Sequence, residues 1–155
     1  MHSTKSQFIE KSTAFPGVEF TIRTLNTIAR AERDASIMDQ RLEYSRLTSE
    51  RATQFKALVG DEGSIEDRNA RANALPLDKR LAIIELDERA DAIYQRHIVP
   101  ATIRAAFVSI SGYELDGDSA PGVDALIAGA PDELLAEIHA ACVRGSSLTG
   151  EEAKN

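Results

Sequence analysis

NTIARAERDASIMDQRLEYSRLTSERATQFKALV, residues 26–59, decides the fold class of this chain, because it runs for about 34 residues without glycine or proline. Apolar residues recur in it every three or four positions, at Ile28, Ala31, Ala35, Met38 and Leu42. That spacing predicts an amphipathic helix, with Asn26 or Thr24 as its N-cap. The apolar stripe rotates after Leu42. A continuous helix would be roughly 50 Å long, so we expect either a break near RLTSER (46–51) or an end that projects toward another helix or chain.

The stretch LDKRLAIIELDERADAIYQRHIV, residues 77–99, has the same helical periodicity. One stripe contains Leu86, Ala90, Ile93 and His97, with Ile83 and Tyr94 beside it, and Leu77, Leu81 and Ile84 widen the apolar face. The connector between the two stretches is polar: Gly60 and Gly63 end the first helix, and Ser64 could cap a short helical piece. Two long amphipathic helices joined in this way predict an antiparallel helical hairpin.

The segment before these helices predicts a β-hairpin over about residues 8–24. Val18, Phe20 and Ile22 alternate with polar residues, which is the period of a half-buried strand. The Pro-Gly pair before them, residues 16–17, marks a turn. Two strands alone are marginally stable in water, so we expect the hairpin to pack on helices or to pair with a neighbouring subunit.

Pro100 interrupts the second helical stretch, so either a new helix begins there or one helix kinks. After it, Ile103, Phe107 and Ile110 recur at helical spacing and predict a further apolar helix face.

Two short helical pieces follow, GVDALIAGA (122–130) and PDELLAEIHAACVR (131–144), and Gly145 is expected to end the second. The predicted fold class is mainly α, with an N-terminal β-hairpin or strand, a long antiparallel helical hairpin and a C-terminal cluster of shorter helices. We expect a single helical domain over residues 1–145 and a flexible C-terminal tail over 146–155.

Composition excludes several classes of function. The chain has a formal net charge of −7, which argues against nucleic-acid binding and against an anionic membrane surface. No apolar run approaches the roughly 18 residues of a membrane span, and the N-terminus lacks a signal-peptide core. Cys142 is the only cysteine and lies in an apolar helical run, so we interpret it as a core residue of a cytoplasmic protein.

The stretch SGYELDGDSAPG (111–122) has the alternating acidic residues of a cation-binding loop. An EF-hand loop requires Gly at its sixth position and Glu at its twelfth. Counted from Asp116 those positions hold Pro121 and Ile127, and counted from Glu114 they hold Ser119 and Ala125. The stretch is therefore interpreted as a turn. The chain has no phosphate-binding glycine loop and no nucleophile elbow, so we predict no metal, no cofactor and no enzymatic activity.

Several idiosyncratic phrases resemble a known family. Val108-Ser109-Ile110, Gly112, Glu114, Asp116-Gly117, Pro131, Glu133-Leu134, and Leu148 with Glu151, Glu152, Lys154 and Asn155 carry the match. In this arrangement the chain resembles tail assembly chaperones and related small tail-assembly proteins of long-tailed, siphovirus-like bacteriophages and prophages. The resemblance covers about the last third of the chain and the opening strand. Ala130 stands where glycine is commoner, and Gly150 interrupts the acidic phrase.

This resemblance implies a non-enzymatic assembly factor in the host cytoplasm. It would bind the tape measure protein, keep it soluble and recruit tail-tube protein for polymerisation. Helix-in-groove capture is the expected binding mode. The candidate partner-binding residues are Ile28, Met38, Leu42, Ile83, Leu86 and Ile93. Two alternatives remain: a structural minor tail or tail-completion protein retained in the virion, and a self-associating helical interaction protein, in keeping with a possible homo-oligomer.

Overall fold

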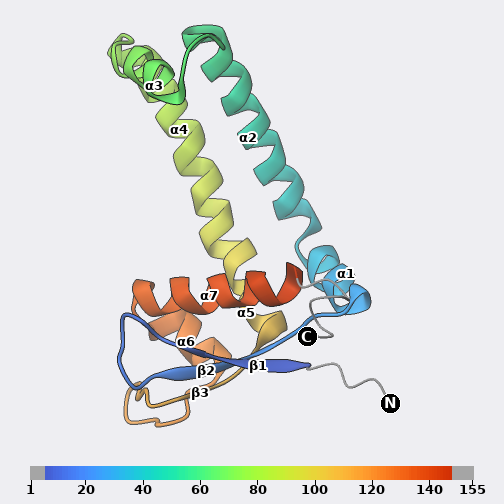
Figure 1. Cartoon of the computed structure of the whole chain (residues 1–155). Helices are drawn as coiled ribbons and strands as arrows, with labels where there is room; N and C mark the ends of the chain where they lie inside the picture. Colours follow the sequence, from blue (N-terminus) through green and yellow to red (C-terminus); the bar gives the residue numbers. More distant parts are fainter. Residues whose placement is uncertain (1–5, 148–155) are drawn as a thin grey trace. The chain divides into compact units, whose positions relative to one another are not determined.

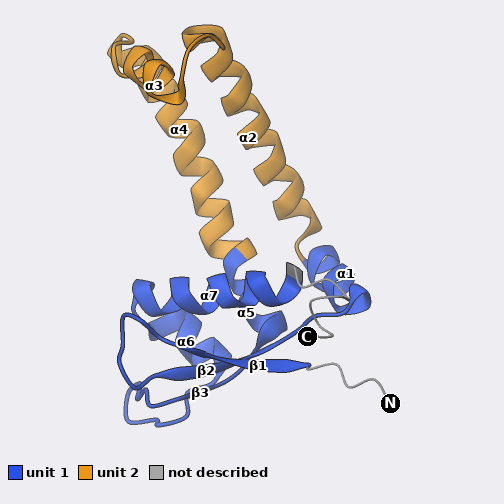
Figure 2. Ribbon diagram, viewed as in Figure 1, with its two compact units in different colours: residues 1–36, 99–155 blue, residues 37–98 orange. Residues whose placement is uncertain are grey.

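The computed structural model describes residues 6–147, and the chain divides into two compact units. Unit 1 contains residues 1–36 and 99–155, and unit 2 contains the intervening residues 37–98 (Figure 2). The predicted fold class is confirmed: the described chain is mainly helical, with an antiparallel sheet and shorter C-terminal helices. A single domain over 1–145 stays a prediction. Most of the predicted tail lies outside the described residues.

The sheet of unit 1 has three antiparallel strands in the order β1-β2-β3 (Figure 1). They are β1 (Gln7–Lys11), β2 (Glu19–Arg23) and β3 (Phe107–Ser111). β1 and β2 form the predicted N-terminal hairpin, in which Phe8 pairs with Ile22. Phe20 and Ile22 are buried while Thr21 between them is half-buried, as period-2 alternation requires.

Four helices complete unit 1: α1 (Thr27–Ser36), α5 (Val99–Ala106), α6 (Val123–Gly129) and α7 (Asp132–Ser147). α7 packs against β2, and α5 packs against α1, α6 and α7. Thirteen buried residues form one core, which includes Ile22, Leu134 and Ile138, each with no exposed surface. Cys142 is also fully buried there, as predicted, and burial raises the pKa of its thiol to about 12.

The predicted helix through Phe107 and Ile110 is wrong, because α5 ends before Phe107 and β3 begins there. The pairing of β2 with β3 shifts register between Thr21 and Ile22, so that the ladder skips Val108. An extra residue of this kind lets two positions three apart face the same side of a strand. Phe107 and Ile110 are both buried for this reason, and their spacing imitates that of a helix.

Gly145 does not end α7, which continues to Ser147. A Cβ at this position would lie 3.0 Å from Cε1 of Phe8 and 3.4 Å from Cγ2 of Ile22. The glycine therefore lets the helix approach the sheet closely, and packing rather than termination explains its presence.

The loop between β1 and β2 is held by Glu137 of α7. The backbone N–H groups of Thr13 and Ala14 each donate to Oε1 of Glu137 at 2.9 Å. The hydroxyls of Ser12 and Thr13 donate to the same carboxylate. These hydroxyl bonds are the main cause that lowers the pKa of Glu137 to about 2, because hydrogen bonds to the charged form favour it.

Unit 2 is an antiparallel helical hairpin. It contains α2 (Met38–Val59), α3 (Ile65–Asn73), α4 (Leu77–Ile93) and the π-helical turn η1 (Tyr94–Ile98). α2 packs along α4 and contacts α3. Its buried cluster is small: Leu47, Leu86 and Ala90, with Tyr44 and Ile93 packed against them.

The predicted helix over residues 26–59 breaks at Ile37, well before the expected site at 46–51. The Ser36 hydroxyl donates to the Arg33 carbonyl at 2.6 Å, a local bond that competes with continuation of the helix. Ile37 follows with φ −126° and ψ 27°, outside helical geometry. Asn26 is the N-cap of α1, since its Oδ1 accepts from the Ala29 N–H at 2.8 Å.

Candidate functional site

The candidate partner-binding residues fall into two groups. Ile28 of α1 and Met38 and Leu42 of α2 are more than half exposed. Ile83 and Leu86 of α4 are buried in unit 2, and Ile93 of α4 packs beside Leu86. The first group is free to contact a partner directly. The second group belongs to the core of the hairpin.

The apolar side of α1 faces solvent. Ile28, Ala31 and Ala35 are exposed and, at about 100° per residue, lie on one side of the helix. The opposite side carries Arg30 and Arg33, which bind the C-terminal end of α7: Nη1 of Arg30 donates to the Ser146 carbonyl at 2.9 Å. A cation at a helix C-terminus is favourable, and here it satisfies a terminal carbonyl. The polar side of α1 thus makes the intramolecular contact.

α4 has apolar residues on two opposite sides. One side is the buried face against α2. On roughly the opposite side, Leu77, Leu81 and Ile84 are 62%, 51% and 46% exposed. We call these three residues the α4 row. The sequence contains this signal, because apolar residues surround α4 more widely than contact with one neighbouring helix requires.

Acidic residues border the α4 row at its C-terminal end. Glu85, Glu88 and Asp91 are all exposed, and Glu88 continues the direction of the row one turn further. The row therefore combines an apolar patch with negative charge, which suits an amphipathic helix with basic residues.

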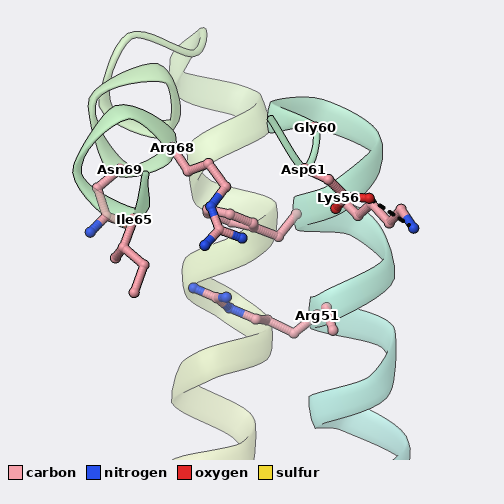
Figure 3. Close-up of a pocket in the computed structure, with 9 residues that line it drawn as sticks. Arg51, Lys56, Gly60, Asp61, Ile65, Arg68 and Asn69 are labelled. Atoms are coloured by element: carbon pink, nitrogen blue, oxygen red, sulfur yellow. Dashed lines mark ion pairs between the residues drawn. The ribbon is translucent and has the colours of Figure 1, made fainter. Parts of the chain in front are cut away.

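A hollow of about 430 Å³ lies within unit 2, at the end of the hairpin where α2 leads into α3 (Figure 3). We call it the tip hollow. Its lining residues are Arg51, Ala52, Phe55, Lys56, Gly60, Asp61, Ile65, Arg68 and Asn69. Figure 3 shows the side chains of Arg51 and Arg68 entering the hollow from α2 and α3, while Lys56 points away toward Asp61.

α3 is fixed in place beside the tip hollow. Ser64 caps it, as predicted, through a capping box in which its Oγ accepts from the Asp67 N–H and Asp67 accepts from the Ser64 N–H, both at 3.1 Å. Nε of Arg71 donates to the Val59 carbonyl at 3.0 Å. The sequence predicts a polar, partly helical connector over residues 60–76 but not the hollow, since the lining residues meet only when α3 folds back on α2.

The acidic loop over residues 111–122 is a turn. Leu115 and Asp118 exchange backbone hydrogen bonds of 3.0 and 2.9 Å, and the central residues Asp116 and Gly117 have φ of 52° and 83°. Two positive φ values in succession are typical of a hairpin turn with an Asp-Gly sequence. Among residues 6–147, no three His, Cys, Asp or Glu side chains are grouped so that they could hold a metal ion.

Comparison with known proteins adds no relative: no protein-family model, curated protein or solved structure matches this chain. Within residues 6–147, no helix combines the length and the apolar composition of a membrane span. The exposed apolar side of α1, the α4 row and the tip hollow are therefore the features from which a function is inferred.

Proposed function

We propose that this protein is a non-catalytic tail assembly chaperone of a long-tailed phage or prophage, acting in the host cytoplasm. It binds the tape measure protein, keeps it soluble and promotes polymerisation of tail-tube protein around it. The resemblance of the C-terminal third and the opening strand supports the identity of the client. The exposed apolar side chains of the helices support the manner of binding.

The α4 row is the observation that carries this proposal. Burial of a leucine or isoleucine side chain contributes roughly 1.5–3 kcal/mol, so three such side chains at helical spacing provide substantial binding energy if a partner covers them. Leu77, Leu81 and Ile84 follow the i, i+4, i+7 pattern by which one helix recognises another. A tape measure protein is a long helical chain and presents apolar stripes of matching period.

Co-expression with the tape measure protein encoded in the same genome tests the proposal. The double variant Leu81→Glu with Ile84→Glu should lose the client from the soluble fraction, because two charges then occupy the apolar row. The matched control, Lys79→Gln with Arg89→Gln, changes the net charge by the same amount at exposed positions of α4 outside the row. It should retain the client.

Hydrogen exchange on the purified complex provides a second measurement. New protection is expected over residues 77–93 when the client is bound. A client that stays soluble beside the variant with both row substitutions, or a complex without added protection in α4, contradicts this binding mode. Light scattering on the chain alone distinguishes client binding from self-association, which would bury the same row in a dimer.

A further inference from the structure

We propose that the tip hollow is a second binding site, which takes a carboxylate carried beside an apolar residue on a partner protein. The proposal goes beyond the chaperone function, because the α4 row does not line this hollow and the site does not require the partner to be a tape measure protein. The hollow lies wholly within unit 2, so one helical hairpin supplies every residue that the site requires.

The cations of the tip hollow differ in how they are neutralised. Nζ of Lys56 is 3.0 Å from Oδ2 of Asp61, and Nε of Arg51 is 3.0 Å from Oδ1 of Asp87. Arg68 has no such carboxylate partner among the described residues, and its Nε is buried without a hydrogen-bond acceptor. A buried donor without an acceptor is costly, and more so when the group is charged. Arg68 is therefore the one of the three cations lining the hollow that has no carboxylate partner among the described residues.

The geometry of the two arginines favours a planar anion. The guanidinium carbon of Arg51 lies over the Phe55 ring, 4.8 Å from its centroid, so the aromatic ring helps to hold this cation in place. Its remaining N–H groups and those of Arg68 enter the same space (Figure 3). A carboxylate presents two oxygens in one plane and can accept from both sides of such a pair.

The remaining wall of the hollow is mixed: Asp61 and Asn69 are polar, and the other side chains are apolar. Phe55 and Ala52 come from α2, and Ile65, which is 68% exposed, comes from the first turn of α3. A volume of about 430 Å³ is within the usual range for small-ligand sites. It accommodates a carboxylate together with the side chain next to it. An acidic residue flanked by an apolar one on a partner helix has this shape and polarity.

The charge of unit 2 as a whole argues against nucleic acid at this site. Residues 37–98 include twelve acidic and ten basic residues, so there is no broad positive field to attract a polyanion. Three further acidic residues are close in sequence to the residues that line the hollow: Glu62, Glu66 and Asp67. This arrangement of charges therefore supports recognition of a single negative charge through short-range hydrogen bonds.

NMR titration of the full-length, 15N-labelled protein tests the site through the Nε–Hε signals of its arginines. One probe is an N-acetylated, C-amidated helical peptide with a Leu and a Glu four residues apart, and the other has Gln in place of that Glu. The Glu peptide should shift the signals of Arg51 and Arg68 to saturation. The Gln peptide should bind at least tenfold more weakly, since it loses the charge-assisted hydrogen bonds. Acetate and inorganic phosphate, titrated separately, identify the anion preferred.

Variants separate this site from general electrostatics. Arg68→Gln should weaken binding of the Glu peptide at least tenfold, whereas Lys79→Gln, an exposed control on α4 with the same loss of charge, should leave it unchanged. Circular dichroism of each variant verifies that the hairpin is folded. Equal binding of the two peptides, no effect of Arg68→Gln, or tighter binding of phosphate than of acetate overturns the proposal. None of these outcomes bears on the α4 row, which the client experiment tests independently.

Discussion

The two units of this chain use their apolar residues in opposite ways. Unit 1 buries thirteen residues in one cluster between its sheet and its helices, whereas the principal cluster of unit 2 has only Leu47, Leu86 and Ala90 fully within it. Large exposed apolar side chains are more frequent in unit 2, which has Met38, Leu42, Ile65, Leu77, Leu81 and Ile84. Unit 1 exposes only Ile9, Ile28, Val108 and Val143 in this class among the described residues.

This difference has a geometric cause. A sheet covered by helices closes around its apolar side chains, but a pair of helices has only one shared seam. Any apolar residue on the outer side of α2 or α4 stays exposed unless a third helix covers it. We infer that unit 1 supplies most of the intrinsic stability of the chain and that unit 2 gains stability when it binds a partner.

The largest expected effect comes from matched core truncations, Leu134→Ala in unit 1 and Leu47→Ala in unit 2. Both side chains are at most 1% exposed, and each truncation should cost about 2–5 kcal/mol. Leu134→Ala should expose Cys142, which is the only thiol of the chain, to a thiol reagent. Leu47→Ala should reduce the helical circular dichroism on mild heating while Cys142 stays protected.

The reactivity of Cys142 makes this comparison decisive. Its thiol is fully buried, and burial raises its pKa, so labelling requires opening of unit 1. If Leu47→Ala accelerates labelling as much as Leu134→Ala does, the two units unfold together. That outcome would support the single domain over residues 1–145 and contradict the inference of separate stabilities.

The sequence is sufficient to predict the elements in which apolar residues keep one regular spacing from end to end. The N-terminal hairpin, the two long helices of the hairpin and the cap at Ser64 follow from alternation, helical spacing and local hydrogen bonding. The sequence is insufficient where a contact with a distant strand or helix changes the spacing of the buried residues. The bulge opposite Ile22 gives Phe107 and Ile110 the spacing of a helix within a strand, and only pairing with β2 reveals it.

The candidate site shows the same limit of local patterns. The spacing of Ile28, Ala31 and Ala35 predicts that they share one face of a helix, but not whether that face is buried or exposed to solvent. Arg30 and Arg33 bind the end of α7, more than a hundred residues later in the chain, and so the apolar side faces solvent. The tip hollow depends in the same way on the return of α3 to α2, which the bond from Arg71 to Val59 helps to fix.

A smaller effect is expected from Glu137→Gln, which weakens the attachment of the β1–β2 loop to α7. The carboxylate accepts four hydrogen bonds that lower its pKa to about 2 from an ordinary value of 4.5. Its stabilisation is therefore complete above about pH 4.5 and is lost as the pH falls toward 2. Because the side chain is only half-buried and solvent screens it, we expect only about 1 kcal/mol of destabilisation at pH 7.

Denaturant unfolding of the wild type and of the Glu137→Gln variant at several pH values measures this contribution. The difference in free energy of unfolding should shrink as the pH is lowered from 6 to about 2. Labelling of Cys142 should become faster in the variant at pH 7, because the loop belongs to unit 1. A difference that does not change with pH would show that the pKa of Glu137 is the same in the folded and the unfolded protein, and it would contradict this stabilisation.

The smallest expected effect is that of Ser64→Ala. This variant tests whether a local change in α3 of unit 2 leaves unit 1 unaffected. Loss of the cap should destabilise α3 by about 0.5–1 kcal/mol, with no change in the labelling of Cys142. Because Arg68 projects from α3, fraying of its first turns should also weaken binding of the Glu peptide at the tip hollow. Ser64→Asp is the matched control, since an aspartate also caps a helix and should restore both properties. If Ser64→Ala frays α3 but leaves peptide binding intact, the peptide does not bind through Arg68, and the carboxylate site proposed at the tip hollow is contradicted.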